Sequence, residues 1–255
     1  MIVEFVGSTG AGKTSLISKI HRKLAQTNVV TTPFDLIAAP LGLSHINHPT
    51  AQNLIQELVA FPFFLGSFKR YRKFLAHTIR TFSQDTKFSL HTVNNLRSLE
   101  RKIGLDEITQ RYNRERIILV DEGPILAAHM FVFASSLVNA SEIATFAALL
   151  PLPDLIVYIK APVEVLIRRA LQRPDPPREM GSKDPVMTEQ FVRGATAVFD
   201  RLMEAERIRS RLLIVDNPDL TDEEHDKIVD KVCASILKFE HLADKPIRYN
   251  FKTPC

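Results

Sequence analysis

Gly7-Ser8-Thr9-Gly10-Ala11-Gly12-Lys13-Thr14 is the stretch that decides the fold class of this chain. It matches the phosphate-binding pattern G-x-x-x-x-G-K-[ST] at every fixed position. A run of β-branched and aromatic residues, Ile2 to Val6, precedes it, and apolar residues recur at helical spacing from Leu16 to Leu24. Because the motif needs a strand before it and a helix after it, sequence and context together predict a loop that binds a nucleoside triphosphate.

Each position of this loop has a physical role. Glycine lets the backbone turn its N–H groups inward, which makes an anion-binding nest at the positive end of the following helix. Lys13 is expected to reach the β- and γ-phosphates, and Thr14 to place its hydroxyl on Mg²⁺. We therefore predict that all eight residues contact the nucleotide, with Lys13 as a catalytic residue and Thr14 as a metal ligand.

A second apolar run, Ile117 to Val120, ends in Asp121-Glu122-Gly123-Pro124. Continuous apolar runs of this length are typical of parallel strands that are buried on both faces. Phosphoryl transfer needs the metal held from a second side, so we expect Asp121 to join Thr14 at the Mg²⁺. Glu122 is a further catalytic candidate, either polarising a water or orienting an acceptor hydroxyl, and a structural role in the turn stays open.

Arginines gather on the polar side and at the end of a helix that is predicted to start at Pro162. They are Arg168, Arg169, Arg173 and Arg178. An arginine that arrives beside a transferring phosphoryl group stabilises the transition state more than the ground state. We therefore expect a lid-like region at residues 168–186, with Arg169 and Arg173 as catalytic candidates. A solvent-exposed helix face with extended arginines is the alternative.

Buried strands and helices alternate along most of the chain, which predicts a parallel sheet covered on both faces. The further predicted strands are Val29 to Thr31, Leu155 to Ile159 and Leu212 to Val215. Residues 31–112 are expected to form a helical segment, with an interruption at Pro62. Long helices are predicted at Met187 to Ser210 and after a capping box at Thr221 and Glu224. We expect one domain over residues 1–255.

Composition narrows the functional classes. A formal charge of +4 and a pI near 9.1 suit an anionic ligand without requiring nucleic acid, and no basic patch interleaved with aromatic residues suggests direct nucleic-acid binding. Two cysteines provide neither a disulfide framework nor a Cys-rich metal site. There is no secretory signal pattern and no apolar window of membrane-spanning length, so we expect no membrane association and a cytoplasmic protein.

With these landmarks placed, the chain resembles the thymidylate kinase and deoxynucleoside kinase group of P-loop kinases. The likeness rests on three stretches, Val6 to Thr14, Ile117 to Glu122, and Pro153 to Arg169. It implies an α/β P-loop NTPase fold, with a five-stranded parallel sheet, helices on both faces and a helical insertion. It also implies ATP as the donor and an acceptor held over the carboxyl ends of the strands, beneath residues 31–112.

The chain also departs from that group. Its thymidylate kinases carry Asp-Arg after the third strand, whereas this chain has Asp121-Glu122, so the arginine expected to touch the acceptor is missing at that point. The second strand ends without a clear acidic-x-Arg pair, and Asp35 is the one nearby carboxylate. The phosphoryl-transfer residues therefore carry over from the resemblance, but a named acceptor does not.

Two functions follow from these observations. The first is an ATP-dependent kinase of a small molecule, with a nucleoside or nucleoside monophosphate as the leading acceptor class; Arg70, Arg72 and Arg80 are basic residues that could hold an anionic acceptor. The alternative is an ATPase that couples hydrolysis to a conformational change or a protein partner. No ABC-type Leu-Ser-Gly-Gly-Gln signature and no Asn-Lys-x-Asp base-reading motif occurs. A homodimer stays open.

Overall fold

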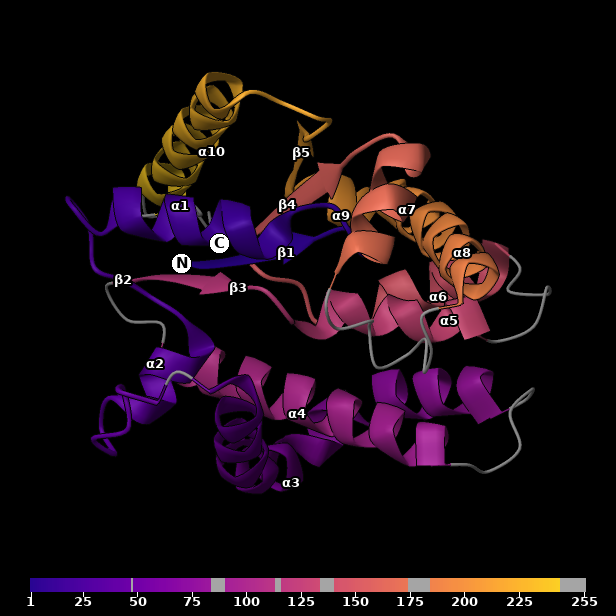
Figure 1. Cartoon of the computed structure of the whole chain (residues 1–255). Helices are drawn as coiled ribbons and strands as arrows, with labels where there is room; N and C mark the ends of the chain where they lie inside the picture. Colours follow the sequence, from indigo (N-terminus) through magenta and orange to yellow (C-terminus); the bar gives the residue numbers. More distant parts are fainter. Residues whose placement is uncertain (47, 84–89, 113–115, 134–139, 174–183, 244–255) are drawn as a thin grey trace, which may run out of the picture.

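The computed structural model describes residues 1–46, 48–83, 90–112, 116–133, 140–173 and 184–243 (Figure 1). Its centre is a parallel sheet with the strand order β2-β3-β1-β4-β5. The strands are β1 (Ile2–Val6), β2 (Val30–Thr31), β3 (Ile117–Val120), β4 (Leu155–Lys160) and β5 (Leu212–Asp216). Strand β1 lies in the middle and pairs in parallel with β3 and β4. The predicted five-stranded parallel sheet is confirmed.

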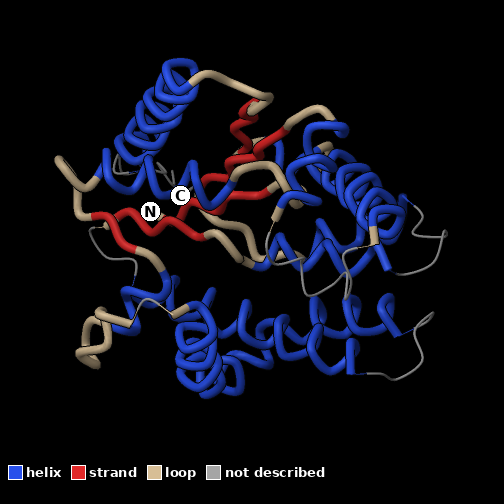
Figure 2. The backbone as a smooth tube through the Cα atoms, in the orientation of Figure 1, coloured by secondary structure: helices blue, strands red, loops and turns tan. Residues whose placement is uncertain are grey.

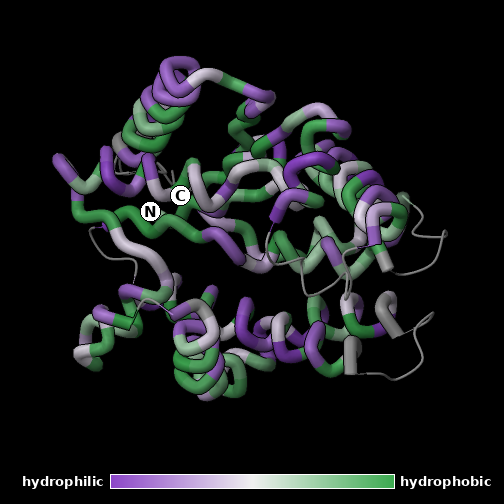
Figure 3. Tube along the Cα trace, in the orientation of Figure 1, coloured by the Kyte–Doolittle hydropathy of each residue, from purple (hydrophilic) through white to green (hydrophobic). Residues whose placement is uncertain are grey.

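Alternation along β1 explains why its apolar residues run without interruption. Val3 and Phe5 pack into the hydrophobic core on one face of the sheet, whereas Val6 packs into the core on the other face. Successive side chains of a strand point to opposite faces, so a strand covered on both faces needs apolar residues at nearly every position. Figure 3 shows this difference, since the strands are hydrophobic along their length while the outer helices alternate.

Helices cover both faces of the sheet, as predicted (Figures 1 and 2). On one face the core is shared with α1 (Lys13–Leu24), α7 (Val163–Gln172) and α10 (Asp222–Ala243). Five further elements pack on the other face: η1 (Pro124–His129), α5 (Met130–Phe133), α6 (Ala140–Leu149), α8 (Pro185–Met203) and α9 (Glu206–Arg209). None of the helices that the described residues form is long and apolar enough to cross a membrane.

The helical insertion between β2 and β3 consists of α2 (Pro33–Ala38), α3 (Pro49–Ser83) and α4 (Leu90–Tyr112). In Figure 1 these helices form a layer of their own below the sheet, with α3 and α4 side by side. The predicted interruption at Pro62 is wrong, because α3 continues through it. Pro62 is exposed, so water can reach the backbone carbonyl that loses its helical hydrogen bond. Packing of α3 against α4 also stabilises the helix.

The predicted helix from Met187 to Ser210 is also two elements. Helix α8 ends at Met203, and Ala205 takes an extended backbone as the N-cap of α9. The break lets Ile208 turn into the core, where it is fully buried. The capping box before α10 is present as predicted, because the Thr221 backbone N–H donates to Glu224 and the Glu224 backbone N–H donates to the Thr221 hydroxyl.

Candidate functional site

The loop from Gly7 to Thr14 is shaped by its glycines and by close backbone contacts. Gly12 is the N-cap of α1 and has a φ of 85°, a left-handed conformation that side chains other than glycine rarely adopt. A Cβ at Gly12 would also lie 2.6 Å from Nδ2 of Asn217. The Ser8 hydroxyl is buried, and no hydrogen-bond partner for it lies in the described part of the chain. The loop therefore presents backbone N–H groups and a buried hydroxyl, the donors that a phosphate group accepts from.

The turn after β5 fixes this loop from the far side. Asn217 is buried, and its Nδ2 donates to the backbone carbonyl of Ala11 at 2.8 Å. Arg169 donates to the backbone carbonyls of Asn217 at 3.1 Å and Pro218 at 2.8 Å. Arg168 and Arg169 both form ion pairs with Asp219. Two of the predicted lid arginines thus hold the β5–α10 turn against the phosphate loop.

The predicted metal ligands lie next to each other. The Thr14 hydroxyl donates to Oδ2 of Asp121 at 3.0 Å, which joins the start of α1 to the end of β3. Burial raises the pKa of Asp121, while the charge of Lys13 and the hydrogen bond from Thr14 counteract that shift. A hydroxyl and a carboxylate at hydrogen-bond distance are an oxygen pair of the kind that Mg²⁺ takes beside phosphates. Lys13 Nζ donates to the carbonyl of Gly7 at 2.8 Å and lies over the loop.

Glu122, next in sequence, points to the opposite wall. Its carboxylate forms an ion pair with Arg101 of α4 at 2.7 Å, and Arg101 also donates to Asn53 of α3. The arginine that the resemblance leads us to expect after Asp121 is absent from the sequence, and the structure instead brings the Arg101 guanidinium to Glu122. Sequence spacing gave no signal for this contact, because residues 101 and 122 belong to separate elements.

A buried carboxyl group supports the turn that carries Asp121 and Glu122. Glu4 of β1 accepts a hydrogen bond from the backbone N–H of Ile125 at 2.9 Å. A Cβ at Gly123 would lie 2.3 Å from the Glu4 carboxyl carbon, so the turn needs glycine there. Burial, followed by the nearby charge of Asp106, raises the pKa of Glu4 to about 8. At neutral pH Glu4 is therefore mainly protonated beneath the turn.

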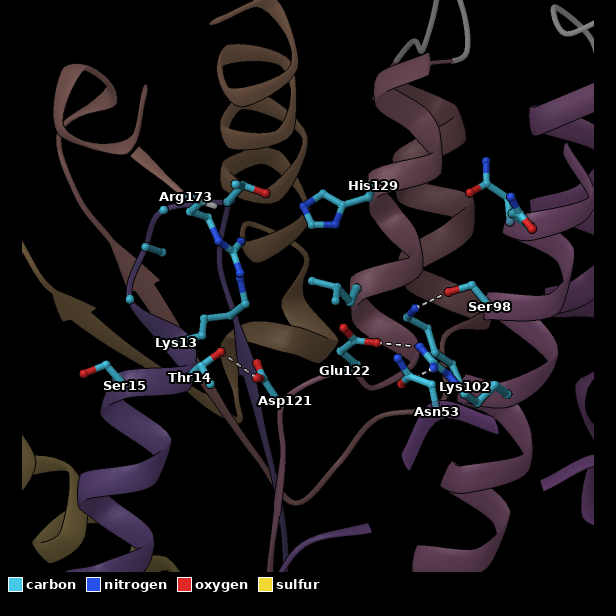
Figure 4. A pocket seen from close by; sticks show the side chains of 18 of the residues that line it. Lys13, Thr14, Ser15, Asn53, Ser98, Lys102, Asp121, Glu122, His129 and Arg173 are labelled. Carbon is cyan, nitrogen blue, oxygen red and sulfur yellow. Dashed lines mark hydrogen bonds and ion pairs between the residues drawn. The ribbon is translucent and has the colours of Figure 1, made fainter. Parts of the chain in front are cut away.

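One continuous cleft of about 560 Å³ is lined by residues of both groups, among them Lys13, Thr14, Asn53, Arg101, Asp121 and Glu122. Figure 4 shows Lys13, Thr14 and Asp121 on one side and Ser98 and Lys102 on the other. The first group comes from the phosphate loop, α1 and β3, and the second from α4. The cleft thus has a phosphate-binding side at the carboxyl ends of the strands and a polar wall made by the helical insertion, which is where the general rule for open α/β sheets places a ligand.

Every predicted catalytic residue borders this cleft, namely Lys13, Asp121, Glu122, Arg169 and Arg173. Arg173 caps the end of α7, and in Figure 4 its guanidinium points toward Lys13. Arg178 and most of the predicted lid-like region lie in residues 174–183, outside the described residues.

Other predicted residues lie away from the cleft. Arg70, Arg72 and Arg80 are exposed and do not border it, and Arg70 forms an ion pair with Glu107. Asp35 belongs to the N-cap of α2, where its backbone N–H donates to the Thr32 hydroxyl. None of the four therefore contributes to this site.

Sequence reasoning missed most of the polar wall opposite the phosphate loop. The additional lining residues from α3, α4 and η1 are Asn53, Glu57, Asn94, Asn95, Arg97, Ser98, Arg101, Lys102, Leu126 and His129. The one sequence pattern that could have indicated them is the row of polar residues at helical spacing in α4. From sequence alone, such a row cannot be distinguished from a solvent-exposed helix face.

Comparison with known proteins identifies the fold. No protein-family model and no curated protein sequence matches this chain. Among solved structures it is similar to deoxyadenosine kinase from M. mycoides with dCMP and dCDP bound, with 15% identity, a TM-score of 0.52, and 93% of this chain and 100% of that chain covered. Structures of that enzyme with bound dCTP and with bound dATP give TM-scores of 0.47 and 0.48, at 13% and 15% identity. They cover 92% and 93% of this chain, and 100% and 99% of those chains.

The chain therefore has the P-loop NTPase fold in the form found in deoxynucleoside kinases. The predicted resemblance is confirmed at the level of the fold. Because the sequence identity is only 15%, the likeness shows the fold and does not assign the acceptor of that enzyme to this chain.

Proposed function

We propose that this chain is an ATP-dependent phosphotransferase that acts on a small molecule. The observation that carries the proposal is the single cleft that joins a phosphate-binding loop to a polar wall of α3 and α4. Nucleosides and nucleoside monophosphates are the acceptors that the fold likeness suggests testing first. An ATPase that only hydrolyses ATP uses water as its second substrate, so it does not need a polar wall for an acceptor opposite the phosphates.

The residues of the loop fit ATP and Mg²⁺. The buried Ser8 hydroxyl and the inward backbone N–H groups would receive the phosphates, and Lys13 would move from the carbonyl of Gly7 onto the β- and γ-phosphates. Thr14 and Asp121 would hold Mg²⁺ between them. The ion would neutralise charge on the phosphate oxygens and fix their orientation.

The arginines divide into two roles under this proposal. Arg173 points into the cleft and would stabilise the charge that spreads over the transferring group. Arg169, which is held by three groups of the β5–α10 turn, would position the loop through Asn217 and Pro218. Glu122 is fixed by Arg101, so we assign it to orienting the acceptor wall and not to activating a water.

Acceptor-dependent ADP release tests the proposal. Purified protein with ATP·Mg²⁺ is expected to release ADP slowly alone and faster with one class of acceptor, because a kinase site excludes water until the acceptor is bound. Lys13→Ala should abolish the stimulated rate. ADP release that is equally fast with and without every acceptor would support the alternative, an ATPase that acts on a protein partner.

We also propose that two copies of the chain pair through α3. Five large apolar residues of this helix are about half-exposed or more, and they recur at alternating spacings of four and three residues. They are Leu54, Leu58, Phe61, Leu65 and Phe68. Such a row is nearly symmetric about Phe61, so it can pack against itself in an antiparallel pair, as a two-fold interface requires. Sedimentation should give a dimer for the wild type and a monomer for Leu58→Glu. A wild-type monomer would refute the pairing.

A further inference from the structure

Helix α4 turns a row of polar side chains toward the cleft. Asn94, Arg97, Ser98 and Arg101 follow one another at i, i+3, i+4 and i+7, and all four line it. The other side of the same helix packs into the core through Leu99 and Ile103. The polar row therefore faces the phosphate loop across the cleft and forms the surface that an acceptor would contact.

Several of these polar groups are buried, which costs free energy unless they have partners. Asn95, Arg101 and Lys102 are 6%, 8% and 6% exposed. Lys102 donates to the Ser98 hydroxyl at 2.6 Å, and Arg101 donates to Asn53 and Glu122. The Asn95 Nδ2 is buried, lines the cleft and has no partner within the described part of the chain.

His129, on the side of the cleft formed by η1, shows the same feature. Its Nε2 is buried and has no hydrogen-bond partner among the described residues. Its ring packs against Phe199 and Phe191, so the imidazole is held in place. Burial also lowers the pKa of His129 well below the usual value, which leaves the ring neutral at physiological pH. Asn95 Nδ2 and His129 Nε2 are thus two buried polar groups that have no partner among the described residues and are placed to bind a ligand in the cleft.

At the mouth of the cleft, Arg97 of α4 forms an ion pair with Glu57 of α3. The Arg97 side chain is 56% exposed, so it can change partners without a large loss of burial. An anionic group entering the cleft can therefore accept hydrogen bonds from Arg97, in the charge-assisted geometry that arginine forms with phosphate and carboxylate.

The apolar content of this wall is small. Beyond the phosphate loop, the one aliphatic residue in the described lining is Leu126, and no Phe, Tyr or Trp occurs in it. A nucleobase in a protein site is commonly held by stacking and apolar contact, whereas amide, hydroxyl, guanidinium and ammonium groups bind ligand oxygens. The wall is accordingly suited to an oxygen-rich ligand.

We infer that the acceptor is a hydroxylated small molecule with an anionic group, a phosphate or a carboxylate, and without a nucleobase. Sugar phosphates and sugar acids are the two sources of this chemistry. This inference rests on the proposed function, because it takes the wall of α3 and α4 as the acceptor side of a phosphoryl-transfer site.

An acceptor panel built from matched compounds tests the inference. It contains sugar phosphates, sugar acids and their neutral parent sugars, together with nucleosides and their monophosphates. We expect ADP release to be stimulated by anionic, base-free compounds, with at least about tenfold loss of kcat/KM when the anionic group is removed. A nucleoside as the best acceptor, or a monophosphate whose base cannot be removed without loss of activity, would overturn it.

Arg97→Gln and Arg111→Gln form a matched pair of variants. Both arginines lie on α4, both are about half-exposed, and both form an ion pair, but Arg111 pairs with Glu107 away from the cleft. Arg97→Gln should raise the KM for the anionic acceptor about tenfold and leave the KM for ATP unchanged. Equal effects of the two variants would refute a role for Arg97 in acceptor binding.

A binding measurement separates failure of the inference from failure of the proposed function. The melting temperature of Lys13→Ala protein is measured with each compound of the panel, so that binding is read without turnover. A shift by anionic sugars, with no compound accelerating ADP release in the wild type, would leave the ligand assignment standing and refute the phosphotransferase. Phosphoryl transfer to an uncharged acceptor would instead support the phosphotransferase and refute the assignment of an anionic ligand.

Discussion

The two sides of the cleft are built in different ways. The phosphate side is a run of eight neighbouring residues, and its groups are mainly backbone N–H donors placed by glycine conformations. The polar wall on the opposite side, which we propose binds the acceptor, consists of side chains from α3 and α4, such as Asn53 and Arg101, which are 48 residues apart in sequence. A backbone-built site specifies one chemistry, whereas a wall of side chains can change its ligand by substitution. Under the proposed function, substitutions on the two sides should therefore affect catalysis and acceptor choice separately.

The largest effect is expected from Lys13→Ala, on the phosphate side. Removing a positive charge that faces the transferring phosphoryl group should lower turnover by about 10³-fold. Lys19→Ala is the matched control, because Lys19 lies on the same helix but pairs with Asp226 at the surface. Both variants should keep the wild-type melting temperature. A Lys13→Ala protein that is insoluble or unfolded would mean that the lysine is structural.

Asp121→Asn should act on the metal. The neutral amide lacks the negative charge of the carboxylate ligand, so the Mg²⁺ concentration for half-maximal activity is expected to rise by about 10–100-fold. Asp216→Asn serves as the control, since Asp216 also ends a parallel strand but is exposed and does not line the cleft. If the two variants show the same Mg²⁺ dependence, Asp121 is not a metal ligand.

Variants of Arg173 and Arg169 test whether one arginine stabilises the transition state while the other only holds the phosphate loop in place. Arg173→Ala should lower kcat about tenfold with little change in the KM for ATP. Arg169→Ala should instead lower the melting temperature, because the β5–α10 turn loses its contacts to Asn217 and Pro218. Kinetics and thermal unfolding of both variants check this, and identical profiles would remove the distinction.

The smallest effect is expected from Glu4→Gln, which lies beneath the turn that joins the two sides. The raised pKa of Glu4, about 8, means that the folded state keeps a proton that the unfolded state releases above the ordinary value of 4.5. The stabilisation is thus complete below about pH 4.5 and is lost as the pH rises to about 8. Among charged side chains, Asp106 raises the pKa of Glu4 and Lys102 lowers it.

Glu4→Gln should keep the hydrogen bond from Ile125, because the amide oxygen replaces the carboxyl oxygen. Between pH 5 and pH 8 its melting temperature should therefore fall less than that of the wild type, by a difference of a few degrees. Thermal unfolding at several pH values measures this difference. Parallel curves for the two proteins would show that Glu4 titrates normally.

The same contrast explains what the sequence can predict. The phosphate loop, the strands and the parallel sheet follow from local patterns, because a glycine motif and buried apolar runs have few alternative structures. Asn217 and Arg101 could not be assigned, since their roles depend on contacts between distant elements. The break at Ala205 likewise depends on where Ile208 finds a place in the core.

The role of the polar row of α4 could not be predicted from the sequence. Its spacing is visible in the sequence, but a polar helix face borders solvent or a cleft depending on how the helix packs. In the structure, α4 lies opposite the phosphate loop, and its buried Asn95 and Lys102 line the cleft.

Product analysis tests the central claim most directly. Wild-type protein is incubated with ATP·Mg²⁺ and the acceptor that stimulates ADP release best, and ³¹P spectra follow the fate of the γ-phosphoryl group. A phosphotransferase predicts a phosphorylated acceptor that appears in step with ADP, and no product with Lys13→Ala. Inorganic phosphate appearing in step with ADP, with the acceptor unchanged, would contradict the account.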